Sequence, residues 1–397
     1  MESGLITGGQ VPRQDKETFA EQDIQEQMPA PSLTSLSCRQ HHAPCQQQLM
    51  FAFKAFYPIV AVALCMRILP TVQAASVNVS ARADTTNCCG YVVTNRNNAY
   101  FRYRSIFDFA AMSSIDEALN AGWFAADGWQ CGGANPYTGQ VPIGSAKNVV
   151  ITKGKGLVLT VPGQSKTAKT FSVAKVQFAP ALLGGILEIE ALLPSAPGTC
   201  TGIFSSHADA GLDKPFGWHD EHDIEMLSTS LLKQVGGQPA GLNMVNYDPT
   251  YLRHRYLLGS KSSSTDLLYL GIRNGTKAYK NQLFPAGIDP SKGFHTYSIS
   301  WFPSTSDSNP AKMTEIRFDG KLQNAPRAFA STHPSSLIIN HWTNGDDHWS
   351  GGPPTQNSAL IVRKAVLYYD QPNAVAPGAR VAKDTTCSQA KACQVTI

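Results

Sequence analysis

Residues 149–161 read VVITKGKGLVLTV. Two runs rich in valine, isoleucine and leucine lie on either side of a Lys-Gly-Lys-Gly turn, a pattern typical of a β-hairpin. Similar short runs, separated by turn residues, recur from about residue 85 to 372. Because no βαβ rhythm or tandem repeat accompanies them, we predict an all-β fold, a jelly-roll sandwich of two antiparallel sheets. Further strands are predicted at 185–192, 297–301, 314–318, 337–339 and 360–369.

Two local patterns add detail to this fold. In the strand at 185–192, the alternation puts Glu188 and Glu190 on a face that we expect to be exposed. One short helix is predicted at 114–121, where Ser114 and Glu117 fit a capping box.

Composition supports an extracellular all-β protein. Of the 397 residues, 42% are hydrophobic and only 16% are charged, and the 32 Gly and 25 Pro supply abundant turn residues. The net charge of +4 forms no dense basic patch, so we do not expect nucleic acid as a partner.

The two ends of the chain differ from its middle. Residues 1–49 are rich in Gln, Ser and Pro and are predicted to be an unstructured extension upstream of the true start. Residues 50–74 resemble a signal peptide, with an apolar run that ends in Val-Gln-Ala; a signal anchor or a buried core segment are the alternatives. A domain at 85–372 follows, and then a polar, cysteine-containing tail at 373–397 without an apolar segment for a membrane anchor. The protein is therefore expected to be secreted. We also expect it to be a monomer.

Cysteines agree with an oxidising compartment. Six follow the proposed cleavage point, an even number whose pairing the sequence does not determine; they are Cys88, Cys89, Cys131, Cys200, Cys387 and Cys393. A local loop between Cys387 and Cys393 is one possibility. Sequons at Asn78 and Asn274 are consistent with glycosylation.

Acidic residues gather in one segment, WHDEHDIEML at 218–227. On a strand, residues two apart share a face, so Glu221, Asp223 and Glu225 should line up together. Such crowding of like charges is unfavourable and is tolerated more readily where the charges have a function.

Carboxylates in this arrangement suit cleavage of a glycosidic bond with retention of configuration. One carboxylate attacks the anomeric carbon, and a second protonates the leaving oxygen and later activates water, with the two groups about 5–5.5 Å apart. Positions i and i+4 of a strand have Cα atoms about 13 Å apart, so the two Glu side chains must lean toward each other across a concave sheet. The central carboxylate would orient the nucleophile.

The segment resembles the Glu-x-Asp-x-Glu signature of glycoside hydrolase family 16. Pieces that resemble secreted fungal members flank it: CCGY at 88–91, LPSAPGTC at 193–200, FHTYSISW at 294–301, NHWTNG at 340–345 and WSGGPP at 349–354. The resemblance implies a β-jelly roll with a concave substrate cleft and endo-acting cleavage of β-1,3 and/or β-1,4 glucan. It makes Glu221 the nucleophile, Asp223 the assisting carboxylate and Glu225 the acid/base.

Other residues are candidates for sugar contacts. Aromatic side chains can stack on pyranose rings, and amide or imidazole groups can bind hydroxyls. The candidates are Trp218, Asn246, Tyr247, His341, Trp342 and Trp349, with Trp342 preferred. His222 departs from the family pattern; we expect a buried neutral histidine with a hydrogen-bond partner.

Alternative interpretations remain. The carboxylates also fit a solvated strand face, and His219, Glu221 and Asp223 are metal-ligand types, although a straight strand spreads them too widely for one small ion. The GTCTG at 198–202 has the spacing of an acyl-transfer nucleophile elbow, but a strand-like run follows it, so a cystine at Cys200 is expected. Within the fold, a transglycosylase or a non-catalytic β-glucan-binding lectin-like protein are the competitors. No cofactor is implied, and no ligand set for a structural calcium stands out.

Overall fold

The predicted hairpin at 149–161 is present. β6 (Val149–Thr152) pairs antiparallel with β7 (Gly156–Val161). Gly154 and Gly156 in the turn have φ of 79° and 125°, conformations that glycine adopts without a steric cost. The computed structural model describes residues 88–208, 219–247, 277–302, 314–323, 331, 333–370 and 388–397.

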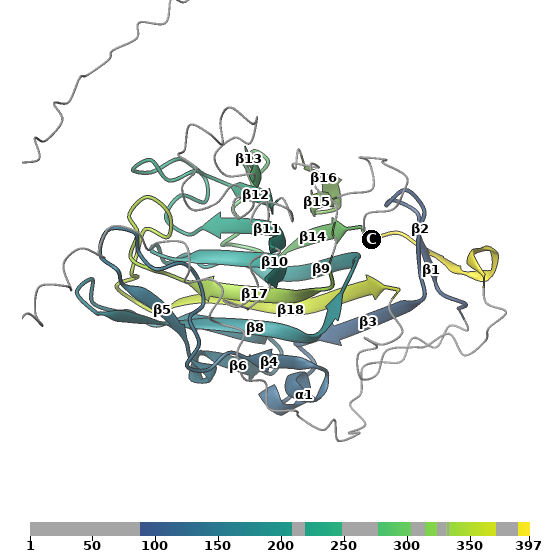
Figure 1. Ribbon diagram of the computed structural model, residues 1–397, viewed down its shortest axis with the longest axis horizontal. Helices are drawn as coiled ribbons and strands as arrows, with labels where there is room; N and C mark the ends of the chain where they lie inside the picture. The colour runs from purple at the N-terminus through teal and green to yellow at the C-terminus, as the bar shows by residue number, and fades with distance from the viewer. Residues whose placement is uncertain are drawn as a thin grey trace, which may run out of the picture. The chain divides into compact units, whose positions relative to one another are not determined.

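Two large sheets contain most of the strands (Figure 1). One, called here the carboxylate sheet, has the order β13 (Lys277–Gln282), β12 (Leu242–Tyr247), β11 (His219–Leu227), β10 (Cys200–Ala208), β17 (Ser335–Trp342), β8 (Thr170–Leu182), β4 (Trp123–Ala125). The other, the supporting sheet, has the order β16 (Lys321–Leu322), β15 (Thr314–Phe318), β14 (His295–Trp301), β9 (Gly185–Leu192), β18 (Ser358–Tyr369), β7, β6. β3 (Tyr103–Asp108) also pairs with β18, and β5 (Val141–Gly144) joins β8 in parallel. All other pairs within these sheets are antiparallel, which confirms the predicted all-β sandwich.

The main core lies between the two sheets. Leu187 and Ile189 from β9 are fully buried together with Ile224 from β11 and Met244 from β12. The alternation of Leu187 and Ile189 with glutamates, and of Ile224 with acidic residues, explains this packing, because only one face of each strand reaches the other sheet.

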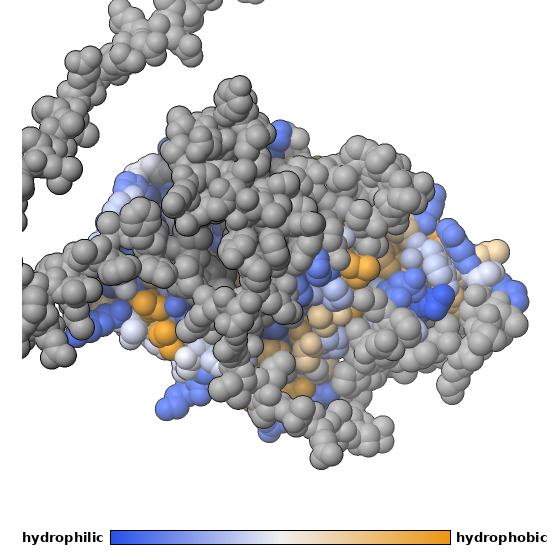
Figure 2. All heavy atoms as spheres, viewed as in Figure 1, coloured by the Kyte–Doolittle hydropathy of each residue, from blue (hydrophilic) through white to orange (hydrophobic). Residues whose placement is uncertain are grey.

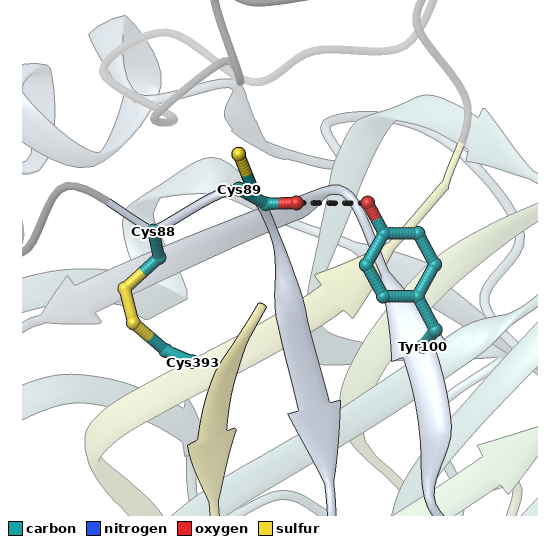
Figure 3. Close-up of a disulfide and its surroundings, with 4 residues drawn as sticks. All are labelled: Cys88, Cys89, Tyr100 and Cys393. Atoms are coloured by element: carbon teal, nitrogen blue, oxygen red, sulfur yellow. Dashed lines mark hydrogen bonds between the residues drawn. A yellow bond between two sulfur atoms is a disulfide. The ribbon is translucent and has the colours of Figure 1, made fainter. Parts of the chain in front are cut away.

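A three-stranded sheet, β19 (Cys393–Val395), β1 (Tyr91–Val93) and β2 (Ala99–Phe101), packs against the supporting sheet. Its side chains form one cluster with Ile186 of β9 and Tyr368 of β18, both buried. A disulfide joins Cys88 to Cys393, and the carbonyl of the neighbouring Cys89 accepts a hydrogen bond from Tyr100 Oη at 2.8 Å (Figure 3).

This sheet corrects two expectations. Residues 388–397 were predicted to belong to a polar tail, but β19 is a parallel partner of β1 and part of the fold. The suggested local loop between Cys387 and Cys393 is wrong, because Cys393 is bonded to a cysteine 305 positions earlier. Long-range strand pairing decided the partner, and spacing along the sequence does not reveal it.

The same three-stranded sheet also changes the environment of Glu188. It was expected on an exposed face, but it is half-buried, and burial raises the pKa of its carboxyl, an effect partly opposed by the positive charge of Arg96. Glu190, further along the strand, pairs with Arg363 at 2.9 Å.

Helices are few among the described residues: α1 (Ile115–Asn120) and the 3₁₀ turns η2 (Ala146–Asn148) and η5 (Gln389–Lys391). α1 confirms the predicted helix, but the predicted capping box is wrong. Ser114 makes no side-chain cap bond, and Glu117 instead accepts hydrogen bonds from the backbone N–H and hydroxyl of Ser113.

The extension at 1–49, the signal peptide at 50–74 and both sequons lie outside the described residues. Within the part that the structure describes, no helix is long and apolar enough to cross a bilayer. Figure 2 shows hydrophilic and hydrophobic residues interspersed on the described surface of one side.

Candidate active site

The three carboxylates share one face of β11. His222 and Ile224 are fully buried on the core face, whereas Glu221 and Glu225 are partly exposed and Asp223 is 6% exposed. The predicted alternation is therefore correct.

Strand pairing identifies the neighbours of each carboxylate. Residues directly opposite each other in an antiparallel pair lie on the same face. The register places Glu221 opposite Ser206, Asp223 between Phe204 and Val245, and Glu225 between Gly202 and Asn243. The next strand, β17, extends these rows with Ser336, Ile338 and Asn340.

Glu221 accepts a short hydrogen bond. Ser206 Oγ donates to Glu221 Oε2 at 2.6 Å, a distance typical of a hydroxyl bonded to an ionised carboxylate. The bond fixes one oxygen and stabilises the charged form, which is the form that a nucleophile needs.

Glu225 has a different partner. The thiol of Cys200 lies 3.5 Å from Glu225 Oε1, and burial, followed by the negative charge of Glu225, raises the pKa of this thiol well above its usual range. The thiol therefore stays protonated and donates to the carboxylate. Cys200 is a free thiol inside β10, so the expected cystine at this position is wrong, and the strand context also excludes a nucleophile elbow.

A glycine makes room beside Glu225. A Cβ on Gly202 would collide with Asn340 Oδ1, so only glycine lets this amide lie against β10. Asn340 is 6% exposed, and its Oδ1 has no hydrogen-bond partner among the described residues. A buried amide oxygen without a partner in the described part of the chain, next to a carboxylate, suits contact with a ligand hydroxyl.

His222 is a core residue, as expected. Its Nε2 lies 3.0 Å from Ser331 Oγ, and its Nδ1 lies 2.7 Å from Asn246 Nδ2 and 3.0 Å from Thr314 Oγ1. Both ring nitrogens therefore have hydrogen-bond partners inside the core.

Two predicted sugar contacts are wrong. Asn246 is fully buried on the core face with His222, and His341 is fully buried between Thr201 Oγ1 at 3.2 Å and Ser358 Oγ at 3.0 Å. Desolvation by burial lowers the pKa of His341 to about 3, so the imidazole is neutral. Both residues lie an odd number of positions from a carboxylate-face residue on their own strands, which puts them on the opposite face.

The tryptophan candidates have different positions. Trp342 lies on the carboxylate face opposite Cys200, but it is only 7% exposed. Little of this side chain therefore reaches the surface. Trp349 is half-buried against the hydrophobic cluster that contains Trp342 and Leu227. Trp218 and the side chain of Tyr247 lie outside the described residues.

Sequence reasoning missed Tyr279. It lies on β13 opposite Val245, in the row of Asp223, and is 41% exposed. Lys-Ala-Tyr-Lys-Asn-Gln at 277–282 has no apolar alternation, so no strand was predicted there. Only the pairing of β13 with β12 shows which way the tyrosine faces.

Among the described residues, no group of three or more His, Cys, Asp or Glu side chains is arranged to hold a metal ion.

Comparisons with known proteins find solved structures that this chain resembles, but they do not place it in a family. No protein-family model matches the chain, and no curated protein matches it. Among solved structures, a Bacillus licheniformis β-glucanase is 18% identical over 67% of this chain and 97% of its own, with a TM-score of 0.45. A β-1,3-1,4-glucanase (lichenase) from a mouse hindgut metagenome is 19% identical over 68% of this chain and 99% of its own, with a TM-score of 0.45. The laminarinase catalytic domain of Thermotoga petrophila is 16% identical over 67% of this chain and 96% of its own, with a TM-score of 0.44. Likeness at this level assigns no family or activity to the chain.

Proposed function

We propose that this chain is a secreted, retaining, endo-acting β-glucanase of glycoside hydrolase family 16. The observation that carries the proposal is the placement of Glu221, Asp223 and Glu225 on one face of β11, with distinct hydrogen-bond donors at the two outer carboxylates. The motif that these residues form resembles that family. The solved β-glucanases to which the chain has a likeness have similar folds, but fold alone does not determine activity.

The proposed reaction has two displacements. In the first, Glu221 attacks the anomeric carbon, the glycosidic C–O bond breaks, and Glu225 gives its proton to the leaving oxygen. In the second, Glu225 takes a proton from water, the water oxygen attacks the same carbon, and the bond to Glu221 breaks. Ser206 stabilises the carboxylate of Glu221 before the first step and again as it departs in the second. Asp223, between them, orients Glu221.

The structural environment supports this division of roles. A nucleophile must be ionised, and Glu221 has a short charge-assisted bond. An acid/base must exchange a proton, and the thiol of Cys200 contacts Glu225 at 3.5 Å, a longer and weaker contact than the 2.6 Å bond from Ser206 to Glu221. A surface that binds sugar without cleaving it does not require three aligned carboxylates.

Purified protein assayed on laminarin, lichenan and chitin oligomers tests the proposal. We expect reducing sugar to be released from at least one β-glucan, with the β-anomer formed first in NMR spectra. Glu221→Gln should abolish release, whereas Glu225→Gln should retain activity on substrates with good leaving groups, because these need no proton. Glu190→Gln, a carboxylate of the supporting sheet, is the matched control and should remain active.

Azide separates the two roles. Glu221→Ala with azide should yield an α-glycosyl azide, since azide replaces the nucleophile; Glu225→Ala with azide should yield the β-azide, since azide replaces water. No activity on any β-glucan, or full activity of Glu221→Gln, would refute the assignment. Transfer products without hydrolysis would favour the transglycosylase instead.

Secretion belongs to the same proposal. The Cys88–Cys393 disulfide and the leader-like residues 50–74 support an extracellular or cell-wall location. The full chain can be expressed in a secreting host and recovered from the culture medium. N-terminal sequencing of the recovered protein should then show that it begins just after residue 74. Retention of residues 1–74 would refute the leader assignment.

A further inference from the structure

Tyr279 is placed unusually for a tyrosine on an edge strand. It lies two strands from Asp223, a lateral distance of about 10 Å, on the same face of the sheet. Tyr279 is 41% exposed and is one of the exposed large hydrophobic residues in the described part of the chain.

The ring is anchored. Tyr279 Oη donates to Asn243 Oδ1 at 2.7 Å, and Asn281 Nδ2 donates to the same oxygen at 3.1 Å. Asn243 is fully buried and donates through its own Nδ2 to the backbone carbonyl of Glu225 at 3.3 Å. A chain of hydrogen bonds therefore connects the tyrosine to the strand position of the acid/base, and it holds the ring in one orientation.

Electrostatics agree with this proximity. The pKa of Tyr279 is raised, first by partial burial and second by the negative charge of Glu225. The phenol therefore stays neutral and continues to donate to Asn243 throughout the range in which a carboxylate pair would operate.

An exposed aromatic ring with amides at its rim has the chemistry of a sugar platform. The C–H face of a pyranose is apolar and packs on an aromatic ring, while the hydroxyls at its edge need hydrogen-bond partners. An ordinary surface tyrosine points its hydroxyl into water. Here the hydroxyl is turned inward to a buried asparagine, and the ring remains accessible.

We propose that Tyr279 is the stacking platform of a glycosyl-binding subsite on the β13 side of Glu225, with Asn243 as its positioning residue. This inference rests on the proposed function, because it assigns a place along the same substrate chain. β12 and β13 are the next strands beyond β11 on this side, so a polysaccharide that crosses the strands from β11 in this direction passes over Tyr279.

Three variants test the platform. Tyr279→Ala removes the ring, Tyr279→Phe keeps the ring and removes the hydroxyl, and Lys280→Ala changes the exposed next residue on the opposite face. Loss of stacking of this kind corresponds to about 0.5–1.5 kcal/mol, or a rise in KM of roughly 2- to 12-fold. We expect that rise for Tyr279→Ala on long oligosaccharides, with kcat within about twofold, and a smaller rise for Tyr279→Phe. Lys280→Ala should match the wild type.

Cleavage patterns and binding complete the test. With end-labelled oligosaccharides, Tyr279→Ala should shift the preferred bond, because one subsite no longer contributes. Titration of the same oligosaccharides into Glu221→Gln, with and without Tyr279→Ala, measures the platform without turnover, and melting curves check folding. If wild type is active but Tyr279→Ala has unchanged KM, pattern and affinity, the platform is refuted and the proposed function stands. If wild type is inactive on every β-glucan, the proposed function fails, and the titration still decides the platform.

Discussion

His341 predicts how the stability of this protein depends on pH. The pKa of the buried imidazole is lowered to about 3, against an ordinary value of 6.5, mainly by desolvation. Because the folded state resists protonation, the unfolded state binds the extra proton between these two values. Stability is therefore full above pH 6.5, is lost as the pH falls, and stops changing because of this group below about pH 3.

The magnitude follows from the linkage relation. Each pH unit inside this window costs about 1.4 kcal/mol, so the free energy of unfolding should fall by about 2 kcal/mol between pH 7 and pH 5 because of His341 alone. The glutamine of His341→Gln cannot take up a proton, so the free energy of unfolding of this variant should fall by about 2 kcal/mol less than that of wild type between pH 7 and pH 5. The variant should still be less stable than wild type at neutral pH, because it loses the bonds to Thr201 and Ser358.

Urea unfolding at the two pH values, for wild type and His341→Gln, measures the difference, and His348→Gln, an exposed histidine, is the control. NMR titration of the His341 ring gives a second readout if the variant unfolds. Equal pH slopes in wild type and His341→Gln, or a ring that titrates near its ordinary pKa, would show that the imidazole is not buried. The sugar-binding role that the sequence suggested would then need to be reconsidered.

Three further changes have defined outcomes. Ser206→Ala removes the donor to Glu221, worth about 1.5–3 kcal/mol, so kcat/KM should fall by up to roughly 100-fold with little change in Tm; an unchanged kcat/KM would contradict the role of this bond. Gly202→Ala forces the Asn340 amide to move, which should cost about 1–3 kcal/mol of stability and lower kcat/KM, and a fully active, equally stable variant would contradict the packing. Cys393→Ser should lower the free energy of unfolding by about 2–5 kcal/mol in urea titrations, whereas no loss would mean that the bridge does not constrain the unfolded chain.

The sequence was informative where a pattern is local. The hairpin at 149–161 and the alternation of Glu221, Asp223 and Glu225 depend only on neighbours along one strand, and both are present. The inward position of His222 follows from the same period of two.

Features that depend on pairing between distant strands were not predictable. The faces of Asn246 and His341 follow from the period of two, but only once their strands and the partners opposite them are known. Tyr279 and Cys393 have no local signal, because their roles arise only when β13 meets β12 and β19 meets β1. The sequence alone also does not show that Cys88 pairs with Cys393.

The position of β18 has a consequence for the order in which the chain acquires structure. This strand is made late, at 358–369, yet it lies inside the supporting sheet between β9 on one side and β7 and β3 on the other. Until it is synthesised, three earlier strands have an open edge and nothing to pair with there. Contacts so distant along the sequence form slowly, and unpaired edges invite association with other chains. Yield on expression should therefore depend on chaperones and temperature, and substitutions in β18 should impair it out of proportion to their effect on the finished protein.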